Sequence, residues 1–222
     1  MSTVVNLKTH DAVGIVTIDS PPVNALSVAV RGGIVDCVRQ AIADPSVQAI
    51  VLTCAGRTFI AGADITEFGK PPKKPALDEV LTAIESSPKP VIAAIHGTAL
   101  GGGLEVALAC HFRVADKNSK LGLPEVKLGL LPGAGGTQRL PRAVGPELAV
   151  KMIIGGAPIG AAEALQNGLI EEVVEEASSG GEAFARKILA EGRPVRRLRD
   201  DDSKLAAARA DRSIFTLSLI HI

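Results

Sequence analysis

Runs of β-branched and aliphatic residues alternate along the chain with segments in which apolar residues recur every three or four positions. Runs of the first kind predict strands, and segments of the second kind predict helices. We expect strands at residues 4–8, 13–19, 48–53, 90–96, 112–115, 120–123 and 170–174, and helices at 28–43 (after Ser27 as N-cap), 77–87, 104–110, 137–144, 146–154 and 160–168. This alternation indicates an α/β fold with a buried, largely parallel sheet.

Composition changes this picture little but excludes several kinds of partner. The chain has 222 residues, of which 46% are hydrophobic and 22% charged, so it can bury a sizeable core as one large domain or two small ones. Lys and Arg number 24 and so do Asp and Glu, which leaves no basic field for nucleic acid or an anionic membrane. The five Phe are the only aromatic residues, so base stacking is not expected. We therefore expect neither nucleic acid nor a membrane as a partner.

The cysteines and the N-terminus indicate a reducing compartment. The first ten residues lack the charged start and apolar core of a secretory signal, and no apolar run reaches the ~18 residues that span a bilayer. Cys37, Cys54 and Cys110 are scattered and odd in number, which argues against disulfides and against zinc. The four His have no partner at metal-ligand spacing, so we expect no metal. A cytoplasmic location is expected, with the peroxisome left open.

The strongest local signal is a run of glycines between an apolar strand and a helix, in the segment Gly97-Thr-Ala-Leu-Gly-Gly-Gly-Leu-Glu105. Glycine lets a ligand approach the backbone, and the first turn of a helix presents unpaired N–H groups at the positive end of its dipole. Such a turn can hold an anion or a developing oxyanion. The dinucleotide pattern G-x-G-x-x-G is not met, because Val106 stands at the last glycine position.

Three carboxylates near glycine-rich turns have two interpretations each. Glu105 falls in the first turn of an otherwise apolar helix, either as a capping residue or as a buried acid. Glu125 follows an apolar strand, either as a surface residue or as a second acid. Asp64 either caps a helix or belongs to a site. A second glycine turn begins at Gly133, before a helix that carries Arg139.

Three segments in register resemble the enoyl-CoA hydratase/isomerase (crotonase) superfamily. They are Phe59-Ile-Ala-Gly-Ala-Asp-Ile65, the segment from Gly97 to Glu105, and Leu123-Pro-Glu-Val-Lys-Leu-Gly-Leu-Leu-Pro-Gly-Ala-Gly-Gly-Thr-Gln-Arg-Leu140. The details look most like the hydratase part of the bifunctional fatty-acid β-oxidation enzymes. The resemblance implies a crotonase-like spiral of ββα units with a helical C-terminal region. We expect this domain at residues 1–190, and a linker or truncated helical segment at 191–222.

The resemblance also implies the site. Two backbone N–H groups, those of Ala63 and Gly102, would form an oxyanion hole for the thioester oxygen, and Glu105 and Glu125 would be the catalytic pair. The residues implied in substrate binding are Ala61, Gly62, Asp64, Ile65, Gly101, Pro124 and Gly133. Both glutamates are present, which favours hydration of a trans-2-enoyl-CoA to a 3-hydroxyacyl-CoA. Which glutamate is the acid and which the base stays open.

The coenzyme A thioester is then the substrate, and no further cofactor and no NAD site are expected. The family often has Lys or Arg two residues after Asp64, whereas this chain has Thr66; Lys70, Lys73 and Lys74 either replace that charge or belong to a solvated loop. Alternatives are Δ3,Δ2-enoyl-CoA isomerase activity, an acyl-CoA-binding pseudoenzyme, and a fragment of a bifunctional hydratase/dehydrogenase.

The end of the sequence differs from the family pattern. Members form homo-oligomers, and their C-terminal helices cover the acyl site. Here Arg212 is followed by ten uncharged residues without a helix-end signal, Ser-Ile-Phe-Thr-Leu-Ser-Leu-Ile-His-Ile222. We expect a truncated C-terminus whose last ten residues are poorly packed or shield apolar surface.

Overall fold

The computed structural model describes residues 4–210 and contains a six-stranded sheet with the order β1-β2-β3-β4-β6-β9. The first two strands pair in antiparallel fashion, and every later pair in the sheet is parallel. The strands are β1 (Val5–His10), β2 (Val13–Ile18), β3 (Ala49–Cys54), β4 (Val91–Ile95), β6 (Phe112–Asp116) and β9 (Glu172–Val174). The expected buried, largely parallel sheet is therefore confirmed.

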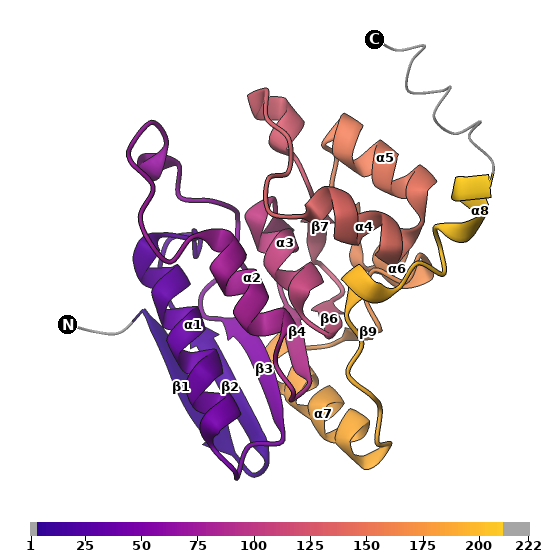
Figure 1. The fold of residues 1–222 in the computed structure, drawn as a ribbon. Coiled ribbons are helices and arrows are strands. Elements are labelled where there is room, and N and C mark those ends of the chain that lie inside the picture. Colours follow the sequence, from indigo (N-terminus) through magenta and orange to yellow (C-terminus); the bar gives the residue numbers. More distant parts are fainter. Residues whose placement is uncertain (1–3, 211–222) are drawn as a thin grey trace.

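Helices cover both faces of this sheet (Figure 1). Every residue of β3 is buried, and its side chains alternate between two apolar clusters. Ile50 and Leu52 pack with α1 (Val28–Ala43), α2 (Leu77–Glu85) and α3 (Gly102–Ala109). Ala49 and Val51 pack on the opposite face with α7 (Ala177–Ala190). Strands buried on both faces need continuous apolar runs, which is the pattern that predicted them.

A smaller three-stranded sheet lies beside α3. It has the order β5-β7-β8, with β5 (Thr98–Leu100) parallel to β7 (Lys120–Gly122) and β8 (Ile159–Gly160) antiparallel to β7. The remaining elements are η1 (Ile65–Glu67), η2 (Glu125–Leu128), α4 (Gly136–Val144), α5 (Pro146–Gly155), α6 (Ala161–Gln166), η3 (Leu198–Asp200) and α8 (Ala206–Ala210). The candidate residues follow β5 and β7 or precede η1, so this sheet gathers them near one another.

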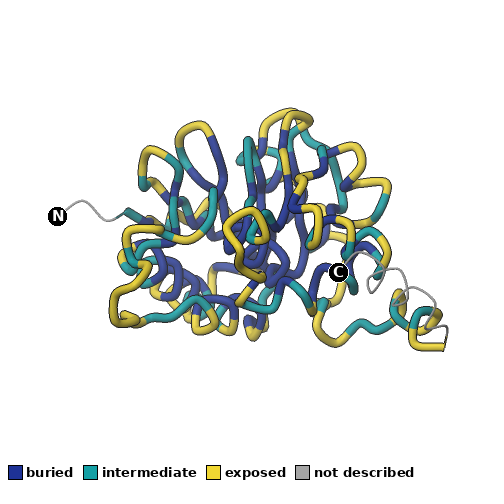
Figure 2. Tube along the Cα trace, turned by 90° about the horizontal axis from the view of Figure 1, so that it is seen from above, coloured by how far each residue is buried: buried dark blue, intermediate teal, exposed yellow. Residues whose placement is uncertain are grey.

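After α7 the chain forms a strap, residues 192–210, that returns along the side of the molecule to α8 (Figure 1). Figure 2 shows buried segments through the middle of the molecule and exposed loops around them. The strap is mostly exposed, although Leu198 packs against the core. Among residues 4–210, no helix combines the length and apolarity required to cross a bilayer.

Most elements agree with the expectations from sequence, and the differences have physical reasons. Ser27 is the N-cap of α1, and its Oγ accepts a hydrogen bond from the Val30 N–H. Helix α3 begins at Gly102 rather than at residue 104, because Gly101 takes the positive φ of 53° that turns the chain into the helix. Strand β5 and helix α7 were not predicted. The expectation for residues 213–222 lies outside the described residues.

Candidate active site

Helix α3 presents free backbone N–H groups at the edge of the smaller sheet. All of its residues are buried, and Gly101 precedes it as N-cap. The first hydrogen bond into the helix is donated by the Glu105 N–H to the Gly101 carbonyl, 3.0 Å away. The Gly102 N–H donates no hydrogen bond to any residue in 4–210, so it is available to a ligand.

A second free amide lies next to the first. Ala63 forms an isolated bridge with Leu26, in which the Leu26 N–H donates to the Gly62 carbonyl at 3.0 Å. The Ala63 N–H itself donates to no other described residue. A Cβ placed on Gly102 would lie 3.9 Å from the Ala63 nitrogen. The structure thus brings Ala63 and Gly102 together, with two unpaired donors at one place.

Glu105 lies one turn into α3 and is 2% exposed. Its Oε1 accepts hydrogen bonds from the backbone N–H groups of Ala134 and Gly136, each at 2.8 Å. A Cβ on Gly136 would lie 3.0 Å from that same oxygen, so the turn approaches the carboxylate as closely as a glycine allows. Glu105 is therefore a buried acid held by the second glycine turn, and it does not cap its own helix.

Glu125 begins η2 and lies next to the glycine run of α3. A Cβ on Gly101 would lie 3.3 Å from its Oε1. Its Oε2 is buried and has no hydrogen-bond partner in residues 4–210. Burial raises the pKa of the Glu125 carboxyl; the negative charge of Glu105 also raises it, and a backbone hydrogen bond lowers it. The two carboxylates are close enough for their charges to interact, as acid–base partners must be.

The other predicted binding residues form the segments around this centre. Asp64 caps η1, since its Oδ1 accepts from the Thr66 N–H at 2.9 Å, which is the simpler of its two interpretations. Pro124 is the N-cap of η2, and Gly133 is exposed with open space where a Cβ would be. The Ala61 N–H donates to the Val23 carbonyl at 3.2 Å.

An apolar rim lies in the chain segments next to Asp64 and Glu125, and apart from Ile65 it was not predicted. Its members are large hydrophobic residues of η1, η2 and the segments that follow them, and all are exposed: Ile65, Phe68, Val126, Leu128, Leu130 and Leu131. Ile65 is 71% and Leu131 76% exposed. Exposed apolar residues grouped in this way mark a surface for an apolar ligand or partner. The only sequence signal was the run of leucines between Glu125 and Gly133.

Arg31 anchors the loop between η1 and α2 and was also missed. It is 8% exposed, and its guanidinium donates to the carbonyls of Leu26, Lys73 and Pro75 and to the Glu67 carboxylate. Lys70, Lys73 and Lys74 are exposed, as in a solvated loop. Arg31 therefore braces both the Leu26 bridge that supports Ala63 and the lysine-bearing loop.

Comparison with known proteins identifies a family and several relatives of the chain. The Enoyl-CoA hydratase/isomerase family profile matches residues 8–196. The chain is 50% identical over 165 residues to the peroxisomal bifunctional enzyme of Danio rerio, an alignment that covers 74% of this chain and 23% of that enzyme. It is 45% identical over 197 residues to a probable enoyl-CoA hydratase of Bacillus subtilis, covering 82% of this chain and 76% of the relative.

Solved structures agree with these sequence matches. The crystal structure of enoyl-CoA hydratase from Bacillus anthracis superimposes with a TM-score of 0.78 at 35% identity, over 84% of this chain and 77% of that one. The chain thus spans about a quarter of the length of the bifunctional relative and about three quarters of the length of the single-activity hydratases.

Proposed function

Because the chain belongs to the enoyl-CoA hydratase/isomerase family, we propose that it adds water to trans-2-enoyl-CoA to give 3-hydroxyacyl-CoA in fatty-acid β-oxidation. The observation that carries this proposal is the grouping of two unpaired amides with two buried or half-buried carboxylates. The crotonase-like spiral of ββα units brings together segments that are far apart in the sequence.

The amides of Ala63 and Gly102 would bind the thioester oxygen. As water adds to the β-carbon, the electron pair of the C=C bond moves through the carbonyl, and negative charge develops on that oxygen. Two unpaired N–H donors that lie near each other in the folded chain would stabilise this charge with little reorganisation. Loss of one such donor costs about 2.7–4 kcal/mol of transition-state stabilisation in other enzymes.

The environments of the two glutamates favour different roles. Glu105 accepts two N–H hydrogen bonds through Oε1, which suits a base that takes a proton from water while the water oxygen bonds to the β-carbon. The raised pKa of Glu125 suits an acid that delivers its proton to the α-carbon. The substrate gains OH at the β-carbon and H at the α-carbon. Glu105 then releases to solvent the proton that it took from water, and Glu125 takes up a proton from solvent, which restores both groups.

The remaining binding assignments belong to the same proposal. The backbone around the oxyanion site and the rim would contact the acyl-CoA through Ala61, Gly62, Asp64, Ile65, Gly101, Pro124 and Gly133. Water addition transfers no electrons, so the proposed reaction needs no redox cofactor. We place it in a reducing compartment, supported by three buried unpaired cysteines; the Danio rerio relative is named peroxisomal.

Turnover of crotonyl-CoA, followed by loss of the conjugated enoyl absorbance, tests the proposal. Glu105→Gln and Glu125→Gln are each expected to lower kcat by about 10²–10⁴, the range of acid–base residues, with little change in thioester binding. Conversion of a 3-enoyl-CoA without hydration would instead indicate an isomerase. Binding of crotonyl-CoA without any turnover would indicate a non-catalytic acyl-CoA-binding protein.

A further inference from the structure

A buried ion pair lies behind the turn that holds Glu105. Glu85, at the end of α2, and Arg139, in α4, form a bidentate pair: Nε of Arg139 donates to Oε1 at 2.9 Å and Nη2 donates to Oε2 at 2.9 Å. The side chain of Glu85 is 3% exposed and that of Arg139 is 10% exposed. The pair therefore holds the guanidinium in a fixed plane, out of bulk solvent.

The third nitrogen of the Arg139 guanidinium contacts the glycine turn. Nη1 of Arg139 donates to the Ala134 carbonyl at 3.1 Å. Gly135 has a φ of 92°, and a Cβ there would collide with Nη1, so the turn lies directly against the guanidinium. The turn comprising residues 134–136 is thus confined on one side by Arg139.

The opposite side of the same turn faces Glu105. The N–H groups of Ala134 and Gly136 donate to Oε1 of that glutamate, and a Cβ on Gly136 would lie 3.0 Å from this oxygen, so the turn packs closely against the carboxylate. Ala134 is therefore held through its carbonyl by Arg139 and bound through its N–H to Glu105. Any shift of the guanidinium moves the two donors that fix the Glu105 carboxylate.

We propose that Arg139, clamped by Glu85, is a positioning residue that holds the Glu105 carboxylate in place through the turn 134–136. The proposal rests on the proposed role of Glu105 in the reaction. Arg199 of η3 adds a third charge, at 3.1 Å from Oε2 of Glu85, but its side chain is 58% exposed. The geometry needs the planar fork of arginine, because one side chain must bind Glu85 twice and Ala134 once.

Arg139→Lys tests this role because lysine keeps the charge but cannot make all three bonds. We expect a folded protein whose kcat for crotonyl-CoA falls about 10–100-fold, the cost of misplacing a reacting group by up to ~1 Å, with KM little changed. The amides of Ala134 and Gly136 should also exchange hydrogen faster in the variant, as observed by NMR without substrate. Glu85→Gln is a second variant that breaks the clamp and should act in the same direction.

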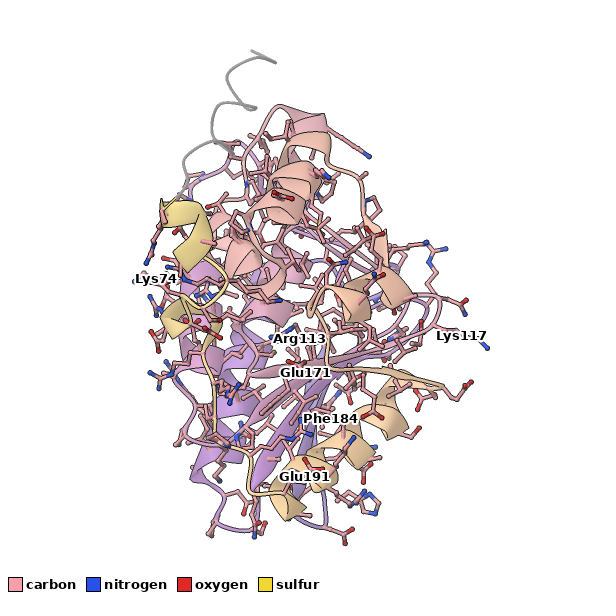
Figure 3. The ribbon with its side chains drawn as sticks, turned by 90° about the vertical axis from the view of Figure 1, so that its right-hand side faces the viewer. Lys74, Arg113, Lys117, Glu171, Phe184 and Glu191 are labelled. Carbon is pink, nitrogen blue, oxygen red and sulfur yellow. The ribbon has the colours of Figure 1, made fainter. Side chains whose placement is uncertain are left out.

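Arg113→Lys is the matched control. Arg113, which is itself buried, also forms an ion pair, with the half-buried Glu171 at 3.0 Å (Figure 3). It also donates to the carbonyls of Leu169 and Cys110, but it lies in β6 and makes no hydrogen bond to the turn 134–136. The Arg113→Lys variant should leave kcat per folded molecule and the hydrogen exchange of the Ala134 and Gly136 amides unchanged. Equal effects of both lysine variants on kcat and on these amides would overturn the proposal.

The amide measurement separates this proposal from the proposed function. If the wild-type protein does not hydrate crotonyl-CoA, the function is wrong, and unchanged exchange at Ala134 and Gly136 in Arg139→Lys would still reject the positioning role. If hydration occurs and Arg139→Lys is folded and fully active, the function stands and the positioning role is wrong.

Discussion

Replacing Gly136 with alanine tests how closely the site depends on the position of Glu105. Gly136 begins α4 outside the left-handed region, so alanine can adopt its backbone conformation. The added Cβ would lie 3.0 Å from Oε1 of Glu105 and 3.0 Å from Cδ1 of Leu123. Both distances are shorter than ordinary van der Waals contact, so the carboxylate must move by a few tenths of an ångström. Its 2.8 Å hydrogen bonds to Ala134 and Gly136 would then lengthen.

The substitution is expected to lower both stability and activity. Overpacking costs about 1–3 kcal/mol, and Gly→Ala at a compatible position returns about 0.4–1 kcal/mol, so the free energy of unfolding falls by at most about 2.6 kcal/mol. Catalytic groups tolerate displacements of about 0.5 Å, and ~1 Å costs about 100-fold. We expect kcat for crotonyl-CoA to fall about 10-fold, which corresponds to ~1.4 kcal/mol in the activation free energy.

The assay is the loss of enoyl absorbance, with thermal unfolding measured on the same samples. Gly155→Ala is the matched control, because Gly155 also lies in a helix without a positive φ and a Cβ there meets nothing within 4 Å. It should keep wild-type kcat. If Gly136→Ala is folded and as active as Gly155→Ala, then contact with the turn does not fix the catalytic carboxylate, and the reasoning fails.

Two further predictions follow from charge and burial. Because the pKa of Glu125 is raised in the folded protein, the folded protein binds more protons than the unfolded chain at pH values between the ordinary and the raised pKa. The stability that this group contributes is therefore present below that pH range and is lost as pH rises through it. The hydration rate should fall over the same rise in pH, and a rate that climbs there would exclude Glu125 as the acid. Arg31→Met should raise KM more than it lowers kcat, because three carbonyls and Glu67 lose their donor near the Ala63 bridge. Arg186→Met, which removes pairs with Asp11 and Glu182 in another part of the fold, is its control, and an equal KM in both variants would contradict the role given to Arg31.

The sheet was predictable because burial on both faces dictates composition. Strand β3 carries only apolar residues and Thr53, and a run of six such residues between turns has the length and composition of a buried strand. The paired strands β1 and β2 were likewise predicted, from their β-branched and aliphatic residues. In each case the signal lies within one short segment, so no knowledge of distant contacts was needed.

Helix α7 was missed because its first turns carry small and polar residues, which on sequence alone are typical of loops. In the structure they permit close approach to the sheet: a Cβ on Gly181 would collide with the Cβ of Ala94. Phe184 then packs against Phe112, with ring centroids 5.8 Å apart. Small residues occur both in helices that pack closely against a sheet and in loops. The residue types alone therefore do not reveal this helix, which becomes apparent only in the folded structure.

The candidate site likewise has residues that the sequence predicts and contacts that only the folded structure shows. Its glycine turns and glutamates are local motifs, and the resemblance identified them; the hydrogen bond from Gly136 to Glu105 was not predicted. The pair of Glu85 and Arg139 joins residues 54 positions apart, and no local pattern connects them. If that pair positions Glu105, a chain that kept every motif but lost Glu85 would still be interpreted as an active hydratase, although the carboxylate of Glu105 would no longer be held. On this proposal the motifs supply the reacting groups, and the rate depends as well on a contact that only the folded chain makes.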